Sequence, residues 1–130
     1  PDADEELNLE MKDSKEKKQI GIISFSSLST EGREIEKLKD SEGYIFQRST
    51  DGKTGKTEKL SKELSRKIKA IKEAGITTPV VVGFGISEVS QVRDAFAMQA
   101  DGIVIGSALF THILNKNLDE YLHQFNGWYE

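Results

Sequence analysis

The chain has 130 residues, 36% of them hydrophobic, with a net charge of -4 and no cysteine. This size supports one modest core, so residues 1–130 are expected to form a single domain. The acidic net charge argues against nucleic acid as a partner, and the lack of cysteine excludes a disulfide scaffold or a thiolate metal site. The absence of a long apolar run argues against a membrane span or a signal peptide. A cytoplasmic location is therefore expected.

The first third of the chain predicts two helices and a strand between them. Residues 5–18 have acidic first turns and a basic last turn, as the helix dipole favours. Residues 20–25 form an apolar strand. The hydroxyl-rich loop 26–30 is expected to cap a helix over residues 30–40, which turns Ile35 and Leu38 inward.

The second strand covers residues 43–48 and leads into the polar loop 49–55. Because side chains alternate along a strand, Tyr44, Phe46 and Arg48 are expected on one face. The Gly, Ser and Thr content of the loop is typical of a flexible lid, although Asp51-Gly52 alone also predicts a simple turn.

The most regular helix is predicted over residues 57–74. Its aliphatic stripe consists of Leu60, Leu64, Ile68 and Ile71. Gly75 is expected to end it in the left-handed conformation. A third strand, over residues 78–82, then leads into Gly83 and Gly85.

The remaining chain repeats this strand–glycine–helix order. Ser87 is expected to cap a helix over residues 88–98. A fourth strand covers residues 103–105, and Gly106-Ser107 opens a helix over 107–114, followed by one over 118–125. The inward residues are predicted to be Val89, Val92 and Phe96 on the first helix and Leu118, Tyr121, Leu122 and Phe125 on the last.

Two of these junctions, 79–87 and 101–108, have the composition of a phosphate site. Each joins a β-branched run, typical of a strand buried on both faces, to glycines and a helix start. Glycine permits close approach of a ligand to the backbone, and a helix start offers unpaired N–H groups. Consecutive junctions of this kind hold phosphate after the last two strands of (β/α)8 barrels.

The residue motifs of these segments and their order along the chain resemble the tryptophan synthase alpha chain. The matching runs are Gly52-x-Thr54-Gly55, Val82-Gly-Phe-Gly-Ile-Ser87, Gln91-Val92-Arg93, Ala100-Asp101-Gly102 and Gly106-Ser107-Ala108. The resemblance covers nearly the whole chain but about half of the family's length. It implies an α/β fold, the carboxyl-terminal (β/α)4 half of a TIM (β/α)8 barrel with parallel strands five to eight.

The family resemblance implies retro-aldol cleavage of indole-3-glycerol phosphate to indole and glyceraldehyde 3-phosphate in tryptophan biosynthesis. The implied phosphate-binding residues are Gly55, Gly85, Gly106 and Ser107; the pocket residues are Tyr44, Phe46, Arg48 and Gly83; the lid residues are Gly52 and Thr54. No catalytic residue is assigned, because the family's acid–base carboxylates belong to the other half of the barrel. The chain alone is therefore expected to be an inactive part of a lyase.

Three residues depart from the family pattern. Phe46 stands where a tyrosine is usual, and Arg48 stands where the substrate's indole ring would pack, unless a bulge turns it outward. Gln99 replaces a glycine at a helix end, where a positive φ would cost about 1 kcal/mol. No cofactor is expected, and no metal, since His112 and His123 have no acidic or thiol neighbour at ligand spacing.

The implied partners are a tryptophan synthase beta chain and whatever closes the barrel, either an amino-terminal half or a second copy of this chain. Two unpaired strand edges would otherwise remain exposed. Two alternatives stay open. One is a non-catalytic alpha-like protein that docks on and regulates a beta chain, and the other is a different phosphate-binding half barrel related to sugar-phosphate isomerases.

Overall fold

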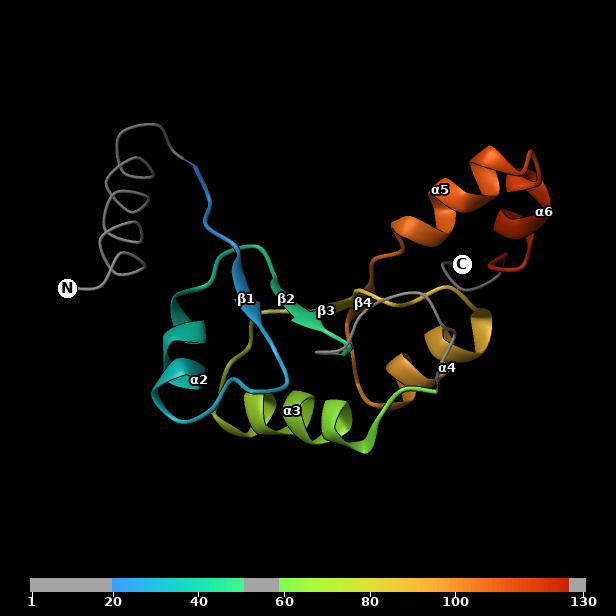
Figure 1. Ribbon diagram of the computed structural model, residues 1–130. Helices are drawn as coiled ribbons and strands as arrows, with labels where there is room; N and C mark the ends of the chain where they lie inside the picture. The colour runs from blue at the N-terminus through green and yellow to red at the C-terminus, as the bar shows by residue number, and fades with distance from the viewer. Residues whose placement is uncertain (1–19, 51–58, 127–130) are drawn as a thin grey trace.

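The computed structural model describes residues 20–50 and 59–126. Within them, four parallel strands form one sheet in sequence order (Figure 1), as the α/β prediction requires. The strands are β1 (Ser24–Ser26), β2 (Ile45–Arg48), β3 (Val80–Gly83) and β4 (Gly102–Ile103). The helices are α2 (Arg33–Lys37) with the short 3-10 turn η1 (Leu38–Asp40), α3 (Lys62–Glu73), α4 (Val89–Ala97), α5 (Ser107–Leu114) and α6 (Leu118–His123).

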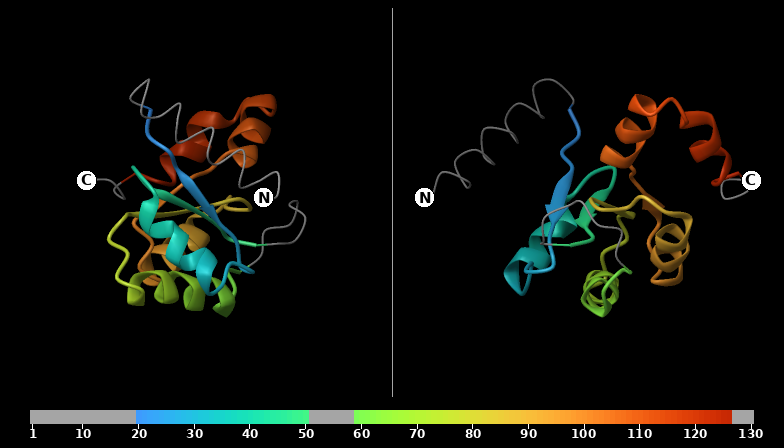
Figure 2. Two further views of the ribbon diagram at one scale, coloured as in Figure 1. Left: turned by 90° about the vertical axis from the view of Figure 1, so that its left-hand side faces the viewer. Right: turned by 45° about the vertical axis from the view of Figure 1, so that its right-hand side comes forward.

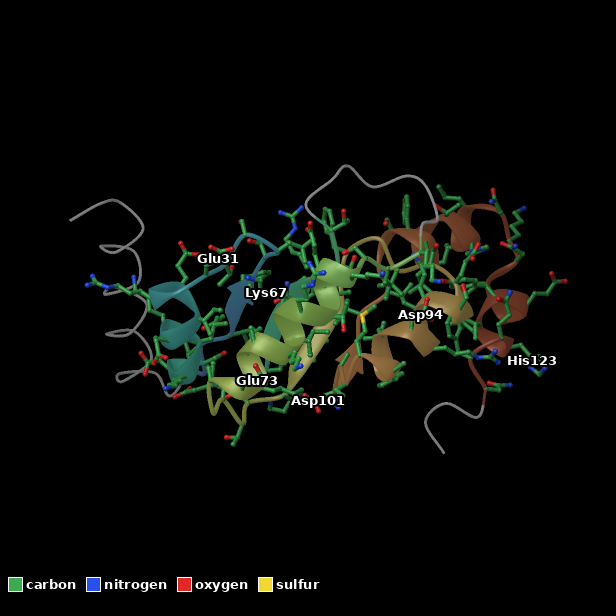
Figure 3. The ribbon with its side chains drawn as sticks, turned by 90° about the horizontal axis from the view of Figure 1, so that it is seen from below. Glu31, Lys67, Glu73, Asp94, Asp101 and His123 are labelled. Atoms are coloured by element: carbon green, nitrogen blue, oxygen red, sulfur yellow. The ribbon has the colours of Figure 1, made fainter. Side chains whose placement is uncertain are left out.

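The helices lie on both sides of the sheet. Helices α2, α3 and α4 lie on one side, whereas α5 and α6 rise on the other side beyond β4 (Figures 1 and 2). Seen from below, α3 crosses the sheet between α2 and α4 (Figure 3). Among the described residues, the part of the sheet near β1 and β2 therefore has helices on one face.

Helix α3 forms the centre of the core. The Ser61 side chain caps it by accepting a hydrogen bond of 3.3 Å from the Leu64 N–H, and Gly75 at φ 83° follows its end. The large apolar core side chains with no exposed surface are Leu64, Ile68 and Ile71 of α3 and Ile45, Val80 and Val82 of the sheet. Each contributes about 1.5–3 kcal/mol by burial.

The two faces of the sheet differ sharply. Ile45 and Gln47 point toward the helices and are fully buried. Phe46 is aligned with Phe25 on the opposite side, and Phe25 is 72% exposed. We call this opposite side, which carries Phe25, Phe46 and Arg48, the open face.

Asp101 joins the starts of β3 and β4. Its Oδ2 accepts hydrogen bonds of 2.8 Å from the Val80 N–H and the Lys72 ammonium, near the end of α3 (Figure 3). Burial raises the pKa of the Asp101 carboxyl, but the Lys72 and Val80 hydrogen bonds and the Lys72 charge lower it further, so the net pKa lies below its ordinary value. The carboxylate therefore contributes to folding stability.

Several helices and strands are shorter in the structure than the sequence predicted. The helix predicted over 57–74 begins at Lys62, because Ser61 supplies the cap. Pairing in β1 and β4 covers only 24–26 and 102–103. The predicted helix 5–18 lies outside the described residues.

The predicted cap of α2 and two predicted inward side chains were wrong. The hydroxyl-rich loop does not cap α2, which begins after Gly32; instead Thr30 Oγ1 accepts a 2.9 Å bond from the Ser27 N–H. Ala95 is fully buried where Phe96 was expected, and Phe96 is 38% exposed. Leu122 is 47% exposed, whereas Tyr121 is buried as predicted.

Candidate functional site

The ends of three parallel strands place the candidate site on one edge of the sheet. Because β2, β3 and β4 run in the same direction, the residues that follow them lie along the same edge. Ser49 follows β2, Gly85 follows β3 and Gly106 follows β4. We call this the carboxyl edge.

The Gly83-Phe84-Gly85 turn has an unusual backbone. Phe84 at φ 75° and Gly85 at φ 84° are both left-handed, which is uncommon for a phenylalanine. The Ser49 hydroxyl donates to the Phe84 carbonyl, and Gln91 Nε2 donates to the Gly85 carbonyl at 3.0 Å. In a trans peptide the N–H points opposite to the carbonyl, so the Gly85 N–H points away from Ser49.

The segment after this turn is held by α4 and α6. Gln91 Oε1 accepts bonds of 2.8 and 3.0 Å from the N–H groups of Ser87 and Glu88. Glu88 rather than Ser87 is the N-cap of α4, so the predicted cap was one residue too early. The Tyr121 hydroxyl donates to the Ser87 carbonyl at 2.7 Å, and burial, with the Glu88 charge, raises the pKa of Tyr121.

Helix α5 contributes its amino terminus to the carboxyl edge. Gly106 is its N-cap and Ser107 its first residue, and no side chain caps it within the described residues. The first N–H groups of a helix lack intrahelical acceptors and carry partial positive charge. A Cβ built on Gly106 would meet nothing within 4 Å among the described residues, so there is open space beside the start of the helix.

Gly83 allows Phe46 to lie close to the backbone on the open face. A Cβ at Gly83 would lie 2.5 Å from the Phe46 Cζ atom and 3.3 Å from the Val104 Cβ atom. The Phe46 ring also lies 5.2 Å from the Phe25 ring, centroid to centroid. Tyr44, the remaining predicted pocket residue, is half-buried just ahead of β2.

Arg48 shares the open face with Phe46. Residues 45–48 pair with 80–83 without a bulge, so the outward-turned alternative does not occur. The Arg48 guanidinium carbon lies 4.4 Å from the centre of the Phe84 ring. Its Nε atom is buried and has no hydrogen-bond partner among the described residues.

Some predicted site residues cannot be placed. Gly52, Thr54 and Gly55 lie outside the described residues. Sequence reasoning also missed Ser49 and the left-handed Phe84, and gave Gln91 no role. The Gln91 contacts had a detectable signal, because a Gln three residues after an N-cap is the capping-box spacing.

Other functional features were sought in the described ranges, 20–50 and 59–126. They contain no group of three His, Cys, Asp or Glu side chains that could hold a metal ion, and no helix with the length and apolarity to cross a bilayer. A groove of about 360 Å³ between α3 and α4 is lined by Lys69, Lys72 and Gln99, away from the carboxyl edge.

Comparisons with known proteins agree on one family. The model for the tryptophan synthase alpha chain matches residues 1–126. The tryptophan synthase alpha chain of Helicobacter pylori strain J99 is 34% identical over 119 residues, which are 88% of this chain and 45% of that relative. The counterpart from Staphylococcus haemolyticus is 32% identical over 95% of this chain and 50% of its own. The chain thus spans about half the length of these relatives.

A solved structure gives the same proportion. A chain of the tryptophan synthase a2b2 complex from Pyrococcus furiosus superimposes with a TM-score of 0.76 at 23% identity, over 91% of this chain and 50% of that one. At this identity the similarity shows the fold.

Proposed function

The chain belongs to the tryptophan synthase alpha chain family, and from this premise we propose that it is the half of a TIM barrel that binds the phosphate of indole-3-glycerol phosphate. The reaction served is retro-aldol cleavage to indole and glyceraldehyde 3-phosphate, in the cytoplasm. The supporting observation is the pair of backbone donors at the carboxyl edge: the Gly85 N–H and the uncapped start of α5.

The chemistry at this edge suits a phosphate ester. Side-chain donors already bind three carbonyls in and just after the Gly-Phe-Gly turn, those of Phe84, Gly85 and Ser87. The Gly106 and Ser107 backbone adds the positive end of α5. Backbone donors fixed by flanking elements bind an anion without reorganising. The lid residues Gly52 and Thr54, with Gly55, would complete this phosphate site.

The proton transfers of the lyase reaction require a complementary half barrel. We assign no catalytic residue here and expect no turnover by this chain alone. The open face and the outer edges of β1 and β4, which pair with no further strand among the described residues, would be closed by an amino-terminal half or by a second copy. The a2b2 complex of the Pyrococcus furiosus relative suggests a beta chain as a further partner.

The phosphate proposal can be tested with glycerol 3-phosphate in an amide NMR titration. We expect shifts at Gly85, Gly106 and Ser107, and none at Gly21 and Gly75, which lie away from the carboxyl edge. Shifts of equal size at all five amides, or none at the first three, would contradict the proposal.

Gly106 provides a matched pair of variants. Gly106→Asp places a carboxylate at the N-cap of α5, where it suits the helix but competes with and repels phosphate, so affinity should fall at least about tenfold. Gly106→Ala adds a Cβ in open space and should keep the affinity. An equal loss in both variants would show that the helix start does not bind the anion.

One observation favours a second function. The buried Arg48 Nε on the open face has no hydrogen-bond partner among the described residues, and an indole ring packed against it would supply no acceptor. This supports the alternative that the chain is a non-catalytic alpha-like protein that regulates a beta chain. Activation of a co-purified beta chain, without cleavage of indole-3-glycerol phosphate by the completed barrel, would identify this function.

A further inference from the structure

Arg48 is the cation closest to the Gly-Phe-Gly turn in the described sheet. It is aligned with Gly83 across β2 and β3 and points to the open face. The next residue, Ser49, donates to the Phe84 carbonyl, and its Oγ lies 3.5 Å from where a Cβ on Gly85 would be. Arg48 thus directly precedes the residue whose side chain binds the backbone of the proposed phosphate site.

The Arg48 guanidinium has a ring contact but no ion pair among the described residues. The guanidinium carbon lies 4.4 Å from the centre of the Phe84 ring, a cation–π contact that supplies no hydrogen-bond acceptor. Among the described residues, its Nε has no partner and no carboxylate forms an ion pair with it. A buried, unpaired donor on a cation is costly unless a ligand or water satisfies it.

A planar carboxylate is the group that best satisfies such a donor set. Two parallel N–H groups of a guanidinium match the two oxygens of a carboxylate, which gives a bidentate charged pair. A neutral aromatic ring would leave the Nε donor unsatisfied.

We propose that Arg48 makes this site prefer, among small aliphatic phosphate esters, those that also carry a carboxylate. The inference rests on the proposed phosphate site: the Gly85 and α5 donors bind the phosphate, and Arg48 binds the carboxylate. Selectivity comes from Arg48, whereas general affinity for phosphate esters comes from the backbone.

The test compares 3-phosphoglycerate with glycerol 3-phosphate, since the first has a carboxylate where the second has a neutral alcohol. We expect calorimetric titration of the full chain to show about five- to tenfold tighter binding of 3-phosphoglycerate. In Arg48→Leu the ratio of the two affinities should approach that set by net charge alone. Arg66→Leu on the exposed side of α3 removes the same charge from the chain and should keep the full preference for 3-phosphoglycerate.

A direct readout is the Arg48 Nε–H signal, assigned by its loss in Arg48→Leu. It should shift with 3-phosphoglycerate and not with glycerol 3-phosphate. Equal affinities for the two esters, or a preference that survives Arg48→Leu, would overturn the role of Arg48 while leaving the phosphate site standing. Failure of both esters to bind would overturn the phosphate site and this inference together.

Discussion

Replacing Gly83 by alanine tests the close packing behind the candidate site. The new Cβ would lie 2.5 Å from Phe46 Cζ and 2.8 Å from Phe46 Cε2, with Val104 Cβ at 3.3 Å on the other side. Alanine is intrinsically favoured over glycine in a strand by about 0.5–1 kcal/mol, whereas overpacking costs about 1–3 kcal/mol. We expect a net loss of about 1–2 kcal/mol in the free energy of unfolding.

Gly102→Ala is the matched control in the neighbouring strand. Its Cβ would lie 3.4 Å from Val81 Cγ2, an ordinary contact, so this variant should be neutral or slightly stabilising. Urea unfolding followed by circular dichroism measures both. A second comparison uses Phe46→Leu, which removes the two clashing ring atoms and should reduce the cost of Gly83→Ala to below about 1 kcal/mol.

Two results would refute this reasoning. One is a Gly83→Ala protein as stable as Gly102→Ala. The other is an unchanged cost of Gly83→Ala in the Phe46→Leu background, which would mean that the ring does not lie against Gly83.

Three further predictions concern stability. Gln99→Gly should raise the free energy of unfolding by about 1 kcal/mol in urea titrations, because Gln99 has φ 71°, and an unchanged midpoint would contradict this. The pKa of Asp101 is lowered in the folded state, so its contribution to the free energy of unfolding is present above the unfolded pKa and is lost as pH falls through the folded pKa. Asp101→Asn should therefore lower the free energy of unfolding by about 1 kcal/mol at pH 7. The difference in stability between Asp101→Asn and the parent should shrink below about pH 4. Tyr121→Phe should lower the free energy of unfolding by about 0.5–1.5 kcal/mol through the lost bond to the Ser87 carbonyl, and an unchanged melting temperature would contradict this.

The strand and helix order was predictable because each element has a strong local signal. The stripe of Leu64, Ile68 and Ile71 has helical spacing, and all three are fully buried. Gly75 ends α3 in the left-handed conformation, as predicted, and Gln99 takes the positive φ considered for it. The parallel sheet follows from strands separated by helices.

The rest depends on contacts between distant residues, which local patterns do not encode. Lys67 belongs to a charged stretch that predicts exposure, yet it is 9% exposed and its ammonium donates to the Thr30 carbonyl; Figure 3 shows it on the side of α3 near the loop that carries Glu31. Phe84 has a left-handed backbone because Ser49 and Gln91 bind the carbonyls around it. Neither partner is adjacent in sequence.

The Tyr121 hydrogen bond has a consequence for the terminal helices. It connects α6 to Ser87, 34 residues earlier, and the His112 ring stacks on Tyr121 at 3.9 Å. Helices α5 and α6 therefore help to hold the segment that follows the glycine turn. Proteolytic removal of α6 would remove this hydrogen bond and leave every strand intact. Affinity for an anion at the carboxyl edge should then depend on whether α6 is present.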